Sequence, residues 1–410
     1  MPCLNPDNRP KIFGRNQTIL KTFAANAREI LAQGRKMFAG QPFKVTTDSG
    51  EIVVLPPQFI NDIRNEPKLS FMTTLAQDFH AHIPGFEPFA AGSQDDELLQ
   101  LVSRKQLTKM LNKVTKPLSD ETNFATELAF GSPTECRLIR GQVAQARKIL
   151  LPVVQQRREA RQQAIAEGKQ VPSFDDALDW FEDESKGRDY DPVMCQLMLS
   201  FVAIHTTTDL MTEVMLKIAE NSDLFDSLRK EITDVLRAEG WKKSALADMK
   251  LLDSVIKESQ RLRPISLISM RRAAAQDVTL PNGMILRKDQ RCMVDASLMR
   301  DPDIYSQPDD FDGHRFKRMR SQAGQENQAH LVSTGPASLG FGHGNHACPG
   351  RFFAANEIKV ALCHLIMKYD WKLAPGCVPK ALENGLVLAV DPNARVEIRR
   401  REPEIDIDAL

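Results

Sequence analysis

One cysteine, Cys348, lies in a glycine-rich loop directly before a predicted helix. The loop reads FGHGNHACPG, and Phe341, Gly342 and Gly350 surround the cysteine in it. Because proline is common at the first position of a helix, Pro349 predicts that the helix begins beside the sulfur. The helix N-terminus then stabilises a thiolate, the form in which cysteine binds a metal. Glycines let the backbone approach a flat cofactor closely, so the loop predicts a cofactor held by sulfur.

Two other interpretations of the cysteine stay open. Most free cysteines inside intracellular proteins are small buried hydrophobic residues. The residue types also suit zinc, since His343 and His346 precede Cys348 and a second pair, Cys363 and His364, follows. Four helical turns separate that pair from Cys348, which places them too far apart to bind one ion.

A charged pair and a polar segment occur in two other predicted helices. Glu258 and Arg261 are three residues apart in LLDSVIKESQRLRP, so they share one helical face and can pair. Such pairs are common on exposed helices, where each is worth about 0–1 kcal/mol. His205, Thr206 and Thr207 interrupt an apolar helix. Polar residues at such positions either bond back to the helix through their hydroxyls or have a functional role.

The cysteine loop resembles the haem-ligand signature FxxGxxxCxG of cytochrome P450 enzymes. Phe341, Gly344, Cys348 and Gly350 match it, and His346 stands where the family often has arginine. The resemblance implies haem (heme b, iron protoporphyrin IX), with Cys348 as the metal ligand. The cofactor-binding residues that it implies are Cys348, Phe341, Gly342, His346, Arg272 and Gly350.

The resemblance extends to the charged pair. The family has an ExxR helix before the cysteine loop, which Glu258 and Arg261 match, and Arg315 in FDGHRF corresponds to the arginine that completes a buried three-residue network. Arg272 matches the arginine that binds a haem propionate, and Arg271 is the next candidate. A guanidinium suits a carboxylate because it can donate two parallel hydrogen bonds.

The polar helix resembles the family's oxygen-binding helix, Ala/Gly-Gly-x-Asp/Glu-Thr. Ile204 replaces the glycine and Thr206 replaces the acid, while Thr207 keeps the threonine. The resemblance implies catalytic roles for Thr207, Thr206 and His205, with Thr207 as a proton-relay alcohol. The AIHTT variant is similar to that of fungal members that oxidise terpenoids and related secondary metabolites.

The function that the resemblance implies is that of a haem-thiolate monooxygenase. It uses dioxygen and electrons to hydroxylate or oxidise a hydrophobic small molecule. No GxGxxG fingerprint follows a predicted strand, so we expect a partner, NADPH-cytochrome P450 reductase, to supply the electrons. Lys317, Arg318, Arg320 and Arg351 are the predicted basic docking residues. The family is found on the cytosolic face of the endoplasmic reticulum membrane.

The composition indicates a globular protein without a nucleic-acid partner. Of 410 residues, 42% are hydrophobic, and 54 Lys plus Arg balance 54 Asp plus Glu, so no net field attracts a polyanion. Seven scattered cysteines favour a reducing compartment over a disulfide framework. The longest apolar stretches are far shorter than the ~20 residues of a membrane span. We therefore expect a cytoplasmic or peripheral protein.

The hydrophobic periodicity predicts a mainly α fold with a small β region. KVTTDSGEIVVLP and DVTLPNGMILRKDQRCMV predict hairpins that turn at SG and PNG. The predicted helices cover Asn16–Met37, Glu97–Leu118, Arg137–Gln163, Pro192–Asn221, Leu224–Ala238, Leu251–Leu262 and Arg351–Lys368.

Three departures from the family are expected in a single haem domain over 1–410. The membrane anchor and part of the central helical core are expected to be missing, the latter near 130–137, where one predicted helix runs almost directly into the next. The family's Trp-x-x-x-Arg is also absent, and Lys105 and Lys109 are the comparable cations. An inactive, truncated haem-binding remnant therefore stays open as an alternative, and a zinc-binding protein as a third.

Overall fold

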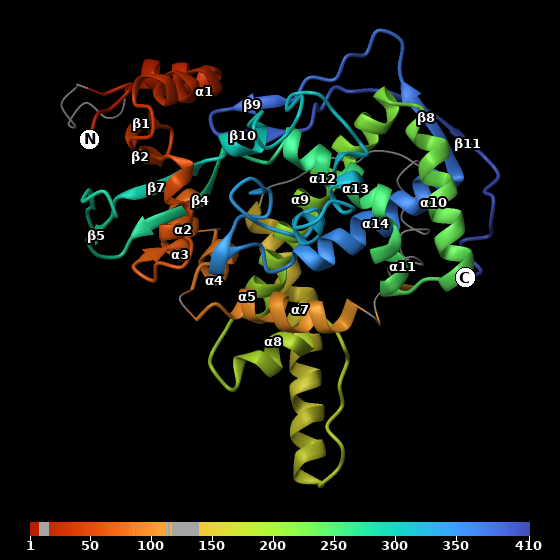
Figure 1. Cartoon of the computed structure of the whole chain (residues 1–410). Coiled ribbons are helices and arrows are strands. Elements are labelled where there is room, and N and C mark those ends of the chain that lie inside the picture. Colours follow the sequence, from red (N-terminus) through yellow and green to blue (C-terminus); the bar gives the residue numbers. More distant parts are fainter. Residues whose placement is uncertain (8–15, 85, 95, 112, 114, 117–138) are drawn as a thin grey trace.

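The computed structural model describes residues 1–7, 16–84, 86–94, 96–111, 113, 115–116 and 139–410. The N-terminal helix and a mixed sheet form one side of the molecule, and the long helices form the other (Figure 1). The predicted mainly α architecture with a small β region is confirmed.

The larger sheet has the strand order β1-β2-β7-β4-β3. β2 and β7 are parallel, and the other neighbours are antiparallel. The β1–β2 hairpin turns at the predicted SG, where Gly50 has φ +110°. Val45, Ile52 and Val54 face α1 and form one hydrophobic cluster with it. The strands are β1 (Phe43–Thr47), β2 (Gly50–Leu55), β3 (Leu69–Ser70), β4 (Ile268–Ala274) and β7 (Arg291–Asp295).

Three two-stranded pairs complete the β structure. The predicted PNG turn joins β5 (Val278–Thr279) to β6 (Ile285–Leu286). β8 (Tyr369–Leu373) pairs with β11 (Val396–Arg400), and β9 (Leu382–Asn384) pairs with β10 (Val387–Ala389). These last four strands, like β3 and β4, were not predicted. β9 and β11 are short and almost entirely exposed, so they lack an apolar alternation.

Six of the seven predicted helices agree with helices of the structure to within a few residues, whereas the predicted helix Glu97–Leu118 is interrupted by a π-helical segment, and the shorter helices were not predicted. Asn16 caps α1, its side chain accepting from the Thr18 N–H, and Asp191 caps α9 before Pro192. The helices are α1 (Gln17–Met37), α2 (Ile60–Ile63), α3 (Phe71–Asp78), α4 (Glu87–Gly92), α5 (Leu98–Leu101), α7 (Ile139–Ala166), α8 (Ala177–Ser185), α9 (Pro192–Glu220), α10 (Leu224–Glu239), α11 (Lys243–Asp248), α12 (Lys250–Leu262), α13 (Arg315–Met319) and α14 (Arg351–Lys368). The expected gap near 130–137 lies outside the described residues.

α9 is the central helix of the fold. It contacts α4, α7, α8, α12, α14 and β8, and its C-terminal half belongs to the largest hydrophobic cluster. Among the described helices, only α9 is long and apolar enough to cross a membrane, by length and composition alone. A core helix of a soluble protein passes the same test, so the absence of a membrane span stays a prediction.

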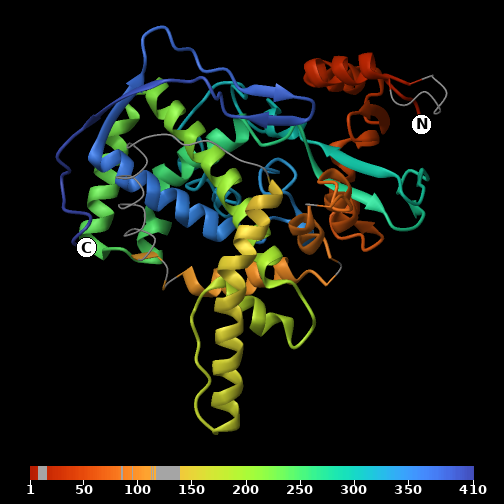
Figure 2. The same ribbon diagram turned by 180° about the vertical axis from the view of Figure 1, so that it is seen from behind.

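α7 projects away from the rest of the molecule, and the chain returns alongside it before α8 (Figures 1 and 2). Arginines on α7 bind carboxylates on this returning segment. Arg157 and Arg158 each donate two or more hydrogen bonds, to Asp176 and Glu182 respectively. These pairs hold α8 against α7. Both α7 and α8 contact α9, the helix that carries the polar segment.

Candidate functional site

Cys348 lies at the N-terminus of α14, although the helix begins later than predicted. Gly350 is the N-cap, and Arg351 rather than Pro349 is the first helical residue. The Cys348 N–H donates to the Phe341 carbonyl at 2.8 Å, which closes the loop. The backbone N–H groups of Gly350 and Arg351 hydrogen-bond the sulfur. The later start places helix-terminal donors at the sulfur, because the first N–H groups of a helix lack intrahelical acceptors.

The electrostatics of Cys348 reflect two opposing causes. Burial raises the pKa of the Cys348 thiol, while the two backbone hydrogen bonds and the Arg351 guanidinium oppose this rise. Arg351 Nη1 donates to the Cys348 carbonyl at 2.9 Å, and Nε donates to the Val332 carbonyl at 3.2 Å. Arg351 is thus part of the cysteine loop rather than a freely exposed docking residue.

Two glycines give the loop its shape. Gly342 and Gly344 have φ +68° and +79°, in the left-handed region that favours glycine. A Cβ on Gly344 would also lie 2.4 Å from the Arg64 carbonyl oxygen. Phe341 packs against the hydrophobic cluster of α12 and α14, so one side of the loop is fixed by the core.

Arg272, on β4, is a buried cation with two unsatisfied donors. It is 2% exposed, and its Nη1 donates to the Arg271 carbonyl at 2.7 Å. Within the described residues, Nε and Nη2 have no hydrogen-bond partner. Burial lowers the pKa of Arg272 to about 10, so it is still protonated at neutral pH. Arg271, the second candidate, instead pairs with Asp78 at 3.0 Å. A carboxylate ligand would satisfy Arg272, which therefore fits a haem propionate.

His346 lies in the electrostatic field of Arg272 and is itself uncharged at neutral pH. Burial, together with the charges of Arg272 and Arg104, lowers the pKa of His346 to about 4. Its ring is 5.9 Å from the ring of Phe71, and Nδ1 is 3.9 Å from Glu97 Oε1. His346 can therefore offer a hydrogen bond, whereas Arg272 supplies the charge.

Arg104 is a site residue that the sequence analysis missed. It lies on a π-helical segment, Val102–Leu107, that interrupts the predicted helix after α5. Its charge reaches both His346 and Arg351, since it lowers the pKa of each. Lys105, one of the cations compared with the family arginine, instead binds Glu184 at 3.0 Å. A π turn shifts the helical register, so the hydrophobic period of the sequence could not show that Arg104 faces the site.

The structure brings Glu258, Arg261 and Arg315 together in one buried network. Arg261 Nε and Nη2 donate to the two Glu258 carboxylate oxygens at 2.8 Å each. Arg315 Nε donates to Glu258 Oε1 at 3.0 Å. Glu258 is 0% exposed, and backbone carbonyls accept the remaining arginine donors. The pair is therefore no surface ion pair, and the network ties α12 to α13.

The polar segment of α9 divides into one buried residue and two exposed ones. Thr207 is buried, and its hydroxyl donates to the Ala203 and Ile204 carbonyls. Thr206 and His205 are exposed, and the Thr206 hydroxyl donates to the Val202 carbonyl. The three residues thus do not converge, and Thr207 alone keeps its hydroxyl inside the fold.

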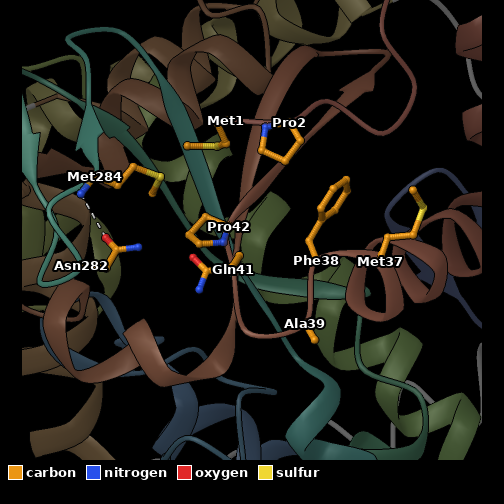
Figure 3. Close-up of a pocket in the computed structure, with 9 residues that line it drawn as sticks. All are labelled: Met1, Pro2, Met37, Phe38, Ala39, Gln41, Pro42, Asn282 and Met284. Carbon is orange, nitrogen blue, oxygen red and sulfur yellow. Dashed lines mark hydrogen bonds between the residues drawn. The ribbon is translucent and has the colours of Figure 1, made fainter.

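Two concave surfaces lie away from the cysteine loop. An open groove, lined mainly by apolar side chains, runs between the N-terminus, the end of α1 and the β5–β6 hairpin (Figure 3). Met1, Met37, Phe38 and Met284 contribute to it. The second cavity, of about 890 Å³, lies beside α3 and contains Asp78. Neither includes a residue from the loop or from α9.

The residues of the zinc interpretation have other contacts. His343 Nε2 is 3.2 Å from Arg64 Nη1, and Nδ1 is 3.1 Å from the Thr334 hydroxyl. Cys363 is fully buried beside Met249. In the part of the chain that the structure describes, no three His, Cys, Asp or Glu side chains gather as a metal site would require.

Comparison with known proteins identifies one family. The model of the cytochrome P450 family matches residues 91–398. "Cytochrome P450 monooxygenase eqxH" from Fusarium heterosporum is 38% identical, and the match covers 100% of this chain and 92% of the relative. "Cytochrome P450 monooygenase 2" from Gibberella fujikuroi is 42% identical, and the match covers 100% of this chain and 91% of that relative. "Cytochrome P450 monooxygenase hepE" from Aspergillus oryzae is 38% identical, with 98% and 86% covered.

The lengths of these matches also differ from the length of this chain. The alignment with the Fusarium heterosporum protein extends over 481 positions, whereas this chain has 410 residues. Some positions of that relative therefore have no counterpart here.

Proposed function

The chain belongs to the cytochrome P450 family and to its monooxygenase class, and on this premise we propose that it oxidises a hydrophobic small molecule in fungal secondary metabolism. The cofactor would be haem b, and NADPH-cytochrome P450 reductase would supply the electrons. The observation that carries the cofactor is Arg272, a buried guanidinium with two unsatisfied donors in the electrostatic field of the cysteine loop.

The residues of the loop would hold the haem from one side. Cys348 would bind the iron through its sulfur, and the N–H groups of Gly350 and Arg351 would moderate the charge of that sulfur. Arg272 would bind a propionate, with His346 as a neutral hydrogen-bonding neighbour. Phe341 and Gly342 would shape the surface against which the ring lies. When bound, a thiolate-ligated haem supplies the chemistry that splits dioxygen.

Thr207 would act on the opposite side as the proton-relay hydroxyl. Its hydroxyl is buried and already oriented by the Ala203 and Ile204 carbonyls, so its oxygen lone pairs are left to accept a proton. Thr206 and His205 are exposed, and the Thr206 hydroxyl donates to the Val202 carbonyl rather than to Thr207. A proton would therefore reach Thr207 from solvent by way of His205 or water, although Thr206 replaces the family's acid.

Two of the four predicted docking residues keep exposed side chains. Lys317 and Arg318 are 45% and 60% exposed, whereas Arg320 binds the buried carboxylate of Asp253 and Arg351 is held in the cysteine loop. Lys317 and Arg318 would therefore contribute most to attraction of an acidic reductase surface. We propose that the protein lies either at the cytosolic face of the endoplasmic reticulum, peripheral to the membrane, or in the cytoplasm.

One observation favours a second candidate, a haem-binding remnant without turnover. The alignment contains positions that this chain lacks, and Ile204 on the central helix is 58% exposed. Exposure of this part of α9 to water would weaken oxygen activation, because exclusion of solvent strengthens the electrostatic interactions in such sites.

Reconstitution with the reductase separates the two candidates without knowledge of the substrate. The full chain, supplied with haem, is mixed with NADPH and a fungal NADPH-cytochrome P450 reductase under carbon monoxide. A monooxygenase should accept electrons and form the reduced carbon monoxide complex. Stoichiometric haem that the reductase cannot reduce would support the remnant.

A further inference from the structure

A second buried charged cluster lies on α12, separate from Glu258 and its arginines. Lys257 is 2% exposed and Asp253 is 4% exposed, and the two stand one helical turn apart. Arg320 and Lys359 bind the Asp253 carboxylate from outside α12, Lys359 Nζ at 2.5 Å from Oδ1. α13 packs against α12, and Lys359 reaches the cluster from α14. Burial of several charges needs a compensating role, since each loses hydration.

The Lys257 ammonium holds a single short segment of backbone. Its Nζ donates to the carbonyls of Gln328, His330 and Ser333, at 3.1, 2.6 and 3.2 Å. These three acceptors use all three protons of the ammonium. The face of the Phe316 ring is 5.1 Å from Nζ and covers it further.

Asp253 holds the same segment through one backbone amide. The Leu331 N–H donates to Asp253 Oδ2 at 2.8 Å, and Leu331 is 1% exposed in the largest hydrophobic cluster. Four backbone groups of Gln328–Ser333 are therefore bound by two side chains of one helix.

The other side of this segment leads to the cysteine. Val332, between the carbonyls that Lys257 holds, accepts from Arg351 Nε at 3.2 Å. Arg351 Nη1 donates to the Cys348 carbonyl at 2.9 Å. A continuous chain of hydrogen bonds thus runs from Lys257 through the segment and Arg351 to the residue that carries the sulfur.

We infer that Lys257 and Asp253 are positioning residues that fix Cys348 at a distance, through Gln328–Ser333 and Arg351. This inference rests on the proposed function, because it concerns how the chain presents its iron ligand. Neither residue touches the cysteine loop itself. Loss of the Lys257 ammonium releases three carbonyls and lets Val332 move, so that Arg351 no longer holds the Cys348 carbonyl in one place.

The test compares Lys257→Met with Lys368→Met in the full chain. Met keeps the apolar stem of lysine and removes the charge. Lys368 is also buried and lies at the far end of α14, where it binds Asp408 at 2.7 and 2.8 Å, so its loss controls for removal of any buried ammonium. Both variants are expected to melt at a lower temperature than the parent chain.

Two readouts then distinguish positioning from general stability. Amide hydrogen exchange within 328–333 and 341–351 should accelerate about tenfold or more in Lys257→Met, and stay near the parental rate in Lys368→Met. In haem-loaded protein, the fraction of the reduced carbon monoxide complex that shows thiolate ligation should fall only in Lys257→Met. Equal exchange and equal thiolate fractions in the two variants would overturn the inference.

A milder variant covers the case in which Lys257→Met does not fold. Lys257→Gln retains a shorter donor and should give intermediate exchange rates in 341–351. Parental rates there would contradict the inference that Lys257 positions the cysteine loop. The exchange experiment is also independent of haem. If the parent chain never shows thiolate ligation, the proposed function fails, while exchange in 341–351 still decides whether Lys257 holds the cysteine loop.

Discussion

Arg261 donates to both carboxylate oxygens of Glu258 at 2.8 Å while both side chains are almost completely buried. The same spacing on an exposed helix would give a pair of little energetic value. Here the carboxylate also binds Arg315, so loss of Glu258 leaves two guanidinium groups without their anion.

Glu258→Ala should therefore lower the free energy of unfolding by about 3–5 kcal/mol, because removal of one partner strands buried charges. The control is Lys230→Ala, which breaks an exposed pair with Asp234 and should cost about 0–1 kcal/mol. Chemical denaturation of both variants measures the difference. Similar losses in the two would show that burial of the network contributes nothing.

Arg272→Met is expected to change haem affinity and apoprotein stability in opposite directions. The variant should bind haem about 10- to 100-fold more weakly, because it loses a charged partner for a propionate. The haem-free protein should become no less stable, since a buried cation with unsatisfied donors is removed. Haem titration and thermal melting measure the two effects. Arg271→Met is the control, and equal haem affinity in both variants would contradict the assignment.

Thr207→Val should keep haem binding and alter the use of electrons. Valine retains the shape of threonine and lacks the hydroxyl, so this position could no longer pass a proton inward, and more NADPH would be consumed per molecule of product. Peroxide and product per NADPH are measured once a substrate is found. Thr206→Val, at an exposed position, should leave this ratio unchanged. If only Thr206→Val lowers the amount of product formed per NADPH, the relay lies one residue earlier.

Glu357→Gln should stabilise the protein at neutral and higher pH. Burial raises the pKa of Glu357 from 4.5 to about 7, and no described residue hydrogen-bonds its Oε2. The folded state then binds the proton more tightly than the unfolded chain, so stability falls as pH rises through this window and is level above it. Melting at pH 5 and pH 8 should show a gain for the variant that is about 2–3 kcal/mol larger at pH 8 than at pH 5. An equal effect at both pH values would rule out this titration.

The sequence predicted the parts of the site that lie in local motifs. Cys348 and the Glu258–Arg261 pair follow from spacing within one loop and one helix, and the long helices follow from their apolar period. Arg104 depends on a π turn that changes the helical register, so its place at the site could not be predicted. The contacts of Lys257 are with backbone carbonyls about seventy residues away, which carry no side-chain pattern.

The absorption spectrum of the reduced protein under carbon monoxide tests the central claim most directly. The full chain, loaded with haem, should show the band characteristic of thiolate-ligated haem, and Cys348→Ala should lose that band while Cys377→Ala, which removes another partly exposed thiol, should retain it. A thiolate band that survives in Cys348→Ala would contradict the assignment of this sulfur. A parent chain that binds no haem would contradict the proposed function as a whole.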